Sequence, residues 1–198
     1  MKHSFEAEYN KLVVPYAPPI NSNKRIIVPN QKVEKVKSLA RRIANAKAVE
    51  AHHLIDGLSE YKRQFTGLLG EAAIEEFFGI DIIDYSVGNS NTYNVADMKK
   101  LGLNIGVKTV EVWKFPIVHK TPYRPELICV KRKDNEVLLF GYASMDILRK
   151  YQTDDFILDR NLRQRGTKSA FYGFSELIEI NSFDELVSTY KKFDKGAI

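Results

Sequence analysis

Three ionisable residues stand in stretches of sequence that are otherwise apolar, and they are the first candidates for chemistry. Glu71 lies in a long apolar helical pattern, Asp97 in a short strand-like run, and Lys108 in the middle of the most apolar strand pattern. A charged group inside such an element costs free energy unless it meets an opposite charge or hydrogen-bond partners. Each residue alone fits a structural role, such as a salt-bridged Glu or a Lys whose ammonium reaches the sheet edge. Together they indicate a shared site.

Two acids and a lysine are the groups that phosphodiester hydrolysis needs. A divalent cation held by carboxylates polarises the phosphate and activates water, while a positive group stands near the attacking or leaving oxygen. Mg²⁺ takes oxygen ligands, typically one or two carboxylates together with water and substrate phosphate. Acids on a helix and a strand, with a lysine on the next strand, would converge on such a site.

The elements that must position these residues follow from the spacing of apolar side chains. Residues 58–78 predict a helix, and 103–113 predict the clearest strand, since apolar residues alternate with Asn104, Gly106 and Lys108. Further elements are expected as strands at 26–28, 80–86, 93–98 and 170–174, a hairpin at 126–131 and 136–143, and helices at 31–51, 144–151 and 183–193. Residues 1–30 hold four prolines and predict an irregular arm. This order favours a mixed α/β domain with one sheet flanked by helices.

Composition within the helical run and around it adds two expectations. Gly67 and Gly70 cost helix stability, so they predict a close approach of the backbone to a neighbouring element. Residues 51–98 carry two Lys/Arg against eight Asp/Glu, although the whole chain has a net charge of +5. An acidic block between basic flanks is typical of a cation site inside a polyanion-binding surface, and equally of ordinary solvated patches. Within the block, Glu60, Glu75 and Glu76 are expected to be surface charge.

Three motifs together resemble the core of the PD-(D/E)XK nuclease superfamily, which includes restriction endonucleases, Holliday-junction resolvases and repair nucleases. They are Gly67-Leu-Leu-Gly-Glu71-Ala-Ala, Val95-Ala-Asp97-Met and Leu103-Asn-Ile-Gly-Val-Lys108-Thr. The resemblance spans roughly residues 58–150 and implies a restriction-endonuclease-like core, with a central mixed sheet of about four to five strands flanked by helices. By motif, Glu71 resembles the helix acid, Asp97 the metal-binding aspartate and Lys108 the catalytic lysine. The backbone carbonyl of Val107 would also face the metal, which would be Mg²⁺ or Mn²⁺.

The chain departs from the family pattern at one position. The family expects Asp or Glu two residues before the lysine, whereas this chain has Gly106, which offers no side chain to a metal. Glu71 would compensate, because acids migrate between core elements in this superfamily. Glu111 is a weaker substitute, because an offset of three from Lys108 places it on the opposite face of the strand.

A second register of the motif stays open. Asp84 followed by Asp97-Met98-Lys99 also reads D…DxK. We rank it second because Lys99 begins a polar turn, whereas Lys108 lies in an apolar strand.

Basic residues in two later segments are candidates for contact with nucleic acid. The candidates are Arg160, Arg163, Arg165, Lys168, Lys120 and Arg124. Side chains of this kind contact phosphates, and Arg also reads base edges. A solvated loop is the alternative interpretation of the first four. His119, beside Lys120, is placed where it could serve in catalysis, but a surface role is more typical.

These observations favour a metal-dependent DNA endonuclease of restriction, recombination or repair, or phage DNA metabolism. One alternative is a catalytically impaired module of the same fold that binds DNA or a protein. Another is a small structural protein in which the three ionisable residues form an internal ion-pair network. Residues 1–57 would form an N-terminal arm and amphipathic helix, and residues 58–198 the nuclease domain with a C-terminal extension, in one compact unit.

The expected partner is DNA, with a homodimer if both strands are cut. No apolar run approaches the ~18 residues that a membrane span requires, so no membrane contact is expected. Cys129 is the single cysteine, which excludes an internal disulfide, and the first residues lack the apolar segment of a secretory signal. We therefore expect a cytoplasmic protein.

Overall fold

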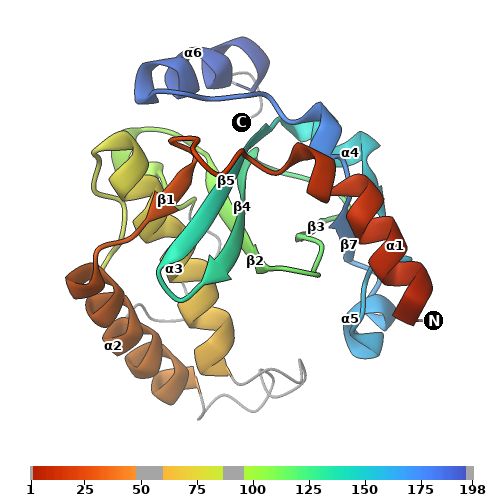
Figure 1. The fold of residues 1–198 in the computed structure, drawn as a ribbon, viewed down its shortest axis with the longest axis horizontal. Helices are drawn as coiled ribbons and strands as arrows, with labels where there is room; N and C mark the ends of the chain where they lie inside the picture. Colours follow the sequence, from red (N-terminus) through yellow and green to blue (C-terminus); the bar gives the residue numbers. More distant parts are fainter. Residues whose placement is uncertain (1, 48–59, 87–95, 195–198) are drawn as a thin grey trace.

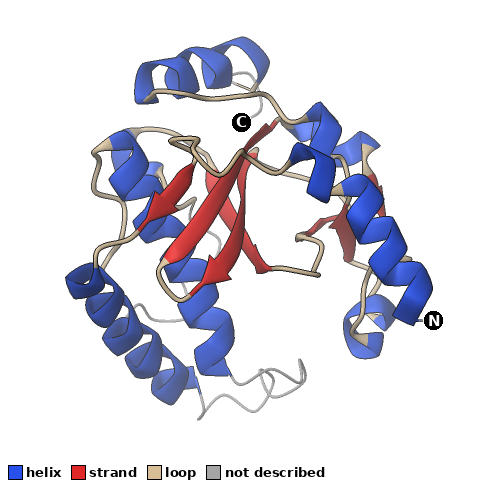
Figure 2. Ribbon diagram, in the orientation of Figure 1, coloured by secondary structure: helices blue, strands red, loops and turns tan. Residues whose placement is uncertain are grey.

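Two sheets with helices around them make up the fold (Figures 1 and 2). The computed structural model describes residues 2–47, 60–86 and 96–194, and every structural statement below concerns these residues. The helices are α1 (Lys2–Leu12), α2 (Asn30–Lys47), α3 (Glu60–Phe78), α4 (Met145–Lys150), α5 (Arg160–Gln164) and α6 (Phe183–Phe193). The strands are β1 (Arg25–Ile27), β2 (Gly106–Glu111), β3 (Ile117–His119), β4 (Glu126–Lys133), β5 (Glu136–Ala143), β6 (Gln152–Thr153) and β7 (Lys168–Phe171).

The main sheet has four strands in the order β1-β5-β4-β2, and the small sheet has three in the order β3-β7-β6. In the main sheet β1 and β4 are antiparallel to β5, whereas β2 runs parallel to β4 and forms one edge. The parallel register sets Gly106 opposite Glu126 and Lys108 opposite Ile128. The chain is therefore a mixed α/β protein with a four-stranded mixed sheet and flanking helices, as the sequence predicts at this level.

Helix α3 packs on one face of β2, and the contact is closest at Gly70. A Cβ atom built at Gly70 would lie 1.6 Å from Oγ1 of Thr109. Because side chains alternate along a strand, Gly106 and Lys108 lie on the opposite face of β2, away from α3. The predicted close approach is confirmed at Gly70 and is wrong at Gly67, where a built Cβ would meet no described atom within 4 Å.

The other face of the main sheet packs against the small sheet and α1, which Figure 1 shows together on the right. This second apolar cluster joins α1, the main sheet and the small sheet through Tyr9, Val13, Phe115, Val118, Ile128, Val130, Ala170 and Phe171. The first cluster lies on the α3 side and includes residues of α2 and α6. Strand β2 therefore stands between two cores.

The irregular arm expected for residues 1–30 is wrong over 2–12, which form α1. The helix exists because it buries one side chain against the second core: Tyr9 is 2% exposed, and its ring centroid lies 5.0 Å from that of Trp113 and 5.4 Å from that of Phe115. Tertiary packing outweighs the weak helical pattern of this segment.

The strand expected at 80–86 is not formed, because the backbone there bonds to a carboxylate instead of a neighbouring strand. One oxygen of Glu75 accepts hydrogen bonds from the N–H groups of Ile82 and Ile83, both at 2.7 Å. Glu75 is 3% exposed and pairs with Lys32 at 2.9 Å. The expectation that Glu75 is surface charge is therefore also wrong.

The run expected as a strand at 93–98 lies partly outside the described residues. Residues 96–98 form a turn that leads into a short 3₁₀ helix, Lys99–Leu101. The strand expected at 103–113 is shorter and corresponds to β2. Because Asp97 lies in a turn and not in a strand, its carboxylate can accept a hydrogen bond from the neighbouring strand β2.

The remaining predicted elements are confirmed with shifted ends. The strand near 26–28 is β1, the hairpin is β4–β5, the strand near 170–174 is β7, and the helix at 31–51 is α2 as far as Lys47. Helix α4 begins after Ser144, whose Oγ accepts a hydrogen bond from the N–H of Ile147 at 3.3 Å. Within the described ranges, none of the helices combines the length and apolar character needed to cross a membrane.

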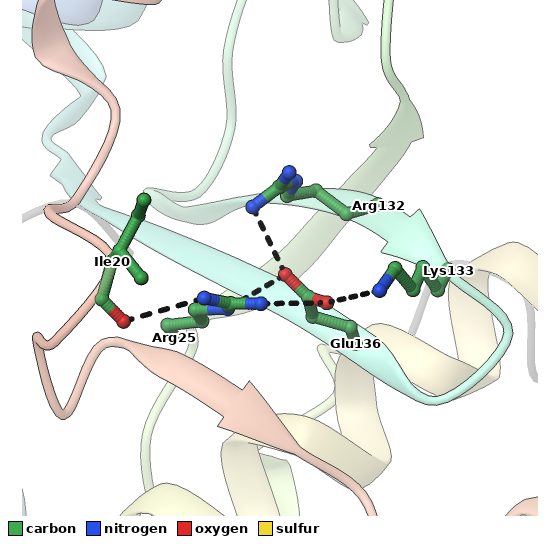
Figure 3. Close-up of polar contacts among 5 residues, drawn as sticks. All are labelled: Ile20, Arg25, Arg132, Lys133 and Glu136. Carbon is green, nitrogen blue, oxygen red and sulfur yellow. Dashed lines mark hydrogen bonds and ion pairs between the residues drawn. The ribbon is translucent and has the colours of Figure 1, made fainter.

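A buried carboxylate ties β1 to the β4–β5 hairpin (Figure 3). Glu136 is 1% exposed and accepts from Nε of Arg25 at 2.8 Å, with Arg132 at 3.2 Å and Lys133 at 3.7 Å. Arg25 also reaches the carbonyl of Ile20 at 3.4 Å. Residues from the N-terminal part of the chain therefore supply a strand of the same sheet that carries Lys108.

The two helical glycines make a matched pair for a stability test. Gly70→Ala should lower the free energy of unfolding by roughly 1–3 kcal/mol, because the new methyl group would overlap Thr109. Gly67→Ala should raise it by about 0.5–1 kcal/mol, because alanine favours the helix and the space is open. Urea unfolding of both variants measures the difference, and equal effects would contradict the close packing of α3 on β2.

Candidate active site

Asp97 is fixed against the open edge of β2. Its Oδ2 accepts a hydrogen bond from the N–H of Val107 at 2.5 Å. In an extended strand the N–H and C=O of one residue lie on the same side, so the carbonyl of Val107 is at the same edge as the carboxylate. Two of the predicted oxygen ligands therefore come together here.

Glu71 follows Gly70 on α3 and lies close enough to Asp97 for the two charges to interact. Burial and the negative charge of Asp97 raise the pKa of Glu71 well above its ordinary value. Burial also raises the pKa of Asp97, against the opposing effect of the hydrogen bond from Val107. A cation bound between such carboxylates would favour their charged forms and release protons.

The space left by the missing acid at position 106 is occupied by Glu126. Gly106 and Glu126 are direct partners in the parallel ladder of β2 and β4. A Cβ atom built at Gly106 would lie 2.1 Å from Oε2 of Glu126 and 2.8 Å from Nε of Arg124. An acidic side chain at 106 and the carboxylate of Glu126 would therefore compete for one position.

Glu126 is not among the site residues that the sequence predicts. The sequence offers one local signal for it. Glu126 directly precedes the buried strand residues 127–130, and acids are disfavoured in strands. Its pairing with Gly106 depends on a parallel contact between two strands whose long connection contains β3, and no local pattern specifies such a contact.

The Glu126 carboxylate is buried and only partly satisfied by hydrogen bonds. Its Oε1 accepts from Nε of Arg124 at 3.3 Å, while Oε2 and Nη1 of Arg124 have no hydrogen-bond partner among the described residues. Burial raises the pKa of Glu126, although the charges of Lys108 and Arg124 act in the opposite direction. Since buried polar atoms normally have partners, a water or an ion beside these two atoms would supply what the described residues lack.

Lys108 lies on the β2 face that points away from α3 and is half-buried. Burial raises the pKa of both Asp97 and Glu126, and the positive charge of Lys108 acts against that rise in each. The structure therefore brings Lys108 together with Asp97 and Glu126, while Glu71 approaches Asp97 from the α3 side.

Two of the six predicted nucleic-acid contacts adjoin this site. Arg124 binds Glu126, as described above, and Lys168 contacts the ring of His119 through Nζ and Nε2. Burial and the charges of Lys168, Lys108 and Arg124 lower the pKa of His119 to about 4, so its ring is neutral at pH 7. Burial, together with Lys108, lowers the pKa of Lys168 to about 8.

The other four lie around α5 and the end of β3. Arg163 donates to two backbone carbonyls of the preceding loop, at 2.7 and 3.2 Å, and so holds that loop. Lys120 pairs with Asp154 at 2.6 Å. Arg160 and Arg165 are exposed on α5 and at its C-terminal end.

The rival acids have other partners. Glu111 pairs with Lys62 at 3.2 Å and Lys114 at 2.9 Å, on the α3 side of β2, as expected from its offset. Asp84 is exposed and accepts from the N–H of Ser86 at 3.0 Å. Lys99 is exposed on its short 3₁₀ helix.

The donor set at the β2 edge fits a hard divalent cation. In the described part of the chain, no group of three or more His, Cys, Asp and Glu side chains is arranged to hold a metal ion. An ion here would thus be held by one or two carboxylates with backbone and substrate oxygens, which is typical of Mg²⁺. Asp97, Glu126 and the carbonyl of Val107 are the groups that would hold it, and the unpartnered Oε2 of Glu126 is the observation that fits.

Comparison of the chain with protein-family models, with curated proteins and with solved structures finds no match. The fold and the site define a mixed α/β protein with carboxylates and a lysine at the edge of a parallel strand pair.

The His119–Lys168 contact can be tested by NMR titration of the His119 ring. Its pKa should be near 4 in the wild type and should rise in Lys168→Met, because one of the positive charges that oppose protonation is removed. Lys120→Met, which changes an exposed lysine paired with Asp154, should leave it unchanged. A wild-type pKa near 6.5 would contradict the arrangement.

The Glu71–Asp97 pair can be tested by thermal unfolding. Asp97→Asn should raise the unfolding temperature in EDTA, because the amide oxygen still accepts from Val107 and the repulsion from Glu71 is gone. The same variant should lose the stabilisation that Mn²⁺ gives the wild type. A variant that is less stable in EDTA and still stabilised by Mn²⁺ would show that Asp97 is a structural residue.

Proposed function

We propose that the protein is a metal-dependent DNA endonuclease with a restriction-endonuclease-like core, related in its site to the PD-(D/E)XK superfamily. In this proposal Glu126 supplies the carboxylate that the family pattern expects at position 106, where this chain has glycine. The observation that carries it is the overlap between a side chain at 106 and the Glu126 carboxylate, beside Asp97 and Lys108.

Each residue has a role that follows from its position. Asp97, Glu126 and the Val107 carbonyl would hold Mg²⁺ or Mn²⁺ at the β2 edge, and Glu71 lies near enough to Asp97 on the α3 side to interact with its charge. A cation bound there would supply polarisation of the phosphate and activation of water. Lys108, next to both acids, orients the water or stabilises the negative charge that develops on the phosphate.

The basic residues around α5 and β3 would hold the DNA backbone, with affinity that falls steeply as salt rises. Cutting both strands would require two sites, which favours a homodimer. A nuclease of this kind belongs to restriction, recombination or repair, or to phage DNA metabolism.

A plasmid-nicking assay tests the hydrolysis. Wild-type protein with Mg²⁺ or Mn²⁺ should nick supercoiled or branched DNA, and Asp97→Asn and Lys108→Met should each lower the rate by about 10²-fold or more. Lys191→Met removes an exposed charge on α6, which carries none of the candidate site residues, and serves as the control. If wild type cuts neither DNA with either metal, the proposal is wrong.

An exchange of positions tests the role of Glu126. Glu126→Gly should abolish cleavage, and adding Gly106→Asp to that variant should restore it, because the new carboxylate would enter the vacated space. Gly106→Asp alone should destabilise the fold, since its Cβ would lie 2.1 Å from Oε2 of Glu126. Full activity of Glu126→Gly alone would contradict the proposal that Glu126 replaces an acid at position 106.

One observation favours a second function, a DNA-binding module of the same fold that does not cut. Arg124 already pairs with the Glu126 carboxylate at 3.3 Å, which neutralises that acid without an ion. The nicking assay separates the two, because a binding module would retain salt-dependent affinity for DNA and leave the plasmid intact.

A further inference from the structure

Positive groups gather beside Glu126 on the face of β2 that is directed away from α3. His119 and Lys168 are direct partners in the antiparallel ladder of β3 and β7, and Nζ of Lys168 contacts Nε2 of the ring. Because the ring is neutral at pH 7, its unprotonated nitrogen accepts from the ammonium. Among the described residues this imidazole is the only hydrogen-bond partner of the Lys168 side chain, so no acid within ion-pair distance neutralises it.

Lys168 also experiences the charges of Lys108 and Arg124, and Glu126 is the acid that partly offsets them. Three side chains that carry positive charge at neutral pH therefore share one half-buried region. Glu126 offsets only part of this positive charge, so a further anion would be favoured there.

Arg124 supplies an independent observation that points to a ligand. Its side chain is 10% exposed, and Nη1 is buried with no hydrogen-bond partner among the described residues. Together with His119, Tyr123 and Glu126, Arg124 lines a small pocket. The free space in this pocket is about 10 Å³, so a phosphate oxygen would reach Nη1 only when the Arg124 side chain turns outward, and its fork of N–H groups then matches phosphate oxygens.

We propose that Arg124, Lys168 and Lys108 form a phosphate-binding site and that His119 is the residue that positions Lys168 in it. The ligand is a phosphate group, and the nucleic-acid backbone is its source if the proposed function holds. The small sheet thereby contributes to a site whose acids come from the main sheet and α3. This inference deepens the proposed function, but it concerns binding and does not require hydrolysis.

The first experiment uses the wild-type protein in EDTA, so that cleavage plays no part. Inorganic pyrophosphate and a DNA duplex of about 20 base pairs are titrated separately, while NMR follows the His119 ring and the Lys168 ammonium. Both ligands should shift these resonances if the site binds backbone phosphates. A shift with pyrophosphate alone would assign the site to free phosphate compounds, and no shift with either would overturn the proposal.

The second experiment compares variants by fluorescence anisotropy with the same duplex, again in EDTA. Lys168→Met should weaken binding about tenfold at low salt and reduce the slope of log K against log salt by about one. Lys191→Met, at an exposed position of α6, should do neither. An unchanged slope in Lys168→Met with intact folding by circular dichroism would overturn the phosphate contact.

The positioning role of His119 needs its own comparison. His119→Gln keeps an acceptor for the ammonium and should retain the wild-type affinity, whereas His119→Leu should weaken binding. The double variant His119→Leu/Lys168→Met should bind no more weakly than Lys168→Met alone. If the two effects add, His119 acts independently of Lys168 and the positioning role is wrong.

These measurements keep the two proposals separate. DNA binding with the expected variant effects, but no cleavage in any metal, would support the phosphate site and reject the nuclease. Cleavage with unchanged affinity and salt slope in Lys168→Met would do the reverse.

Discussion

The parallel register between β2 and β4 is the constraint on which the candidate site depends. It sets Gly106 directly beside Glu126, and only a residue without a side chain leaves room for the Glu126 carboxylate and the Arg124 guanidinium. A shift of one residue would turn Lys108 toward α3 and separate it from both acids. The absence of an acid at 106 is thus a packing requirement of this pair of strands.

The position of β2 between two cores explains how opposite charges are arranged. Helix α3 occupies one face so closely that Gly70 touches Thr109, and it brings Glu71 toward Asp97 at the strand edge. The small sheet lies on the other side and brings His119 and Lys168 toward Lys108. Glu71 and Asp97 therefore approach from α3 and the strand edge, Glu126 and Lys108 belong to the main sheet, and Lys168 comes from the small sheet. A phosphate together with its cation would satisfy both kinds of side chain, because the cation binds the acids and the phosphate binds the basic groups.

Local patterns predicted much of the fold. The helices α3 and α6, the β4–β5 hairpin and the Ser144 cap follow from periodicity and from capping chemistry that act over a few residues. Two of the failures share a physical cause, which is that a group outside the segment supplied an alternative partner. Glu75 captured the backbone of Ile82 and Ile83, and the second core stabilised α1 around Tyr9.

The sequence by itself determined the chemical types in the candidate site: Glu71, Asp97 and Lys108 stand out because ionisable groups are costly in apolar elements. It also identified Gly106 as the position without an acid. Only the tertiary structure decided which residue occupies that space, since Glu126 reaches it by pairing with Gly106, 20 residues earlier, across a connection that contains β3. Likewise, six basic residues are candidates in the sequence, and only the packed structure places Arg124 and Lys168 beside the site. Lys168 reaches it because the small sheet packs against the main sheet.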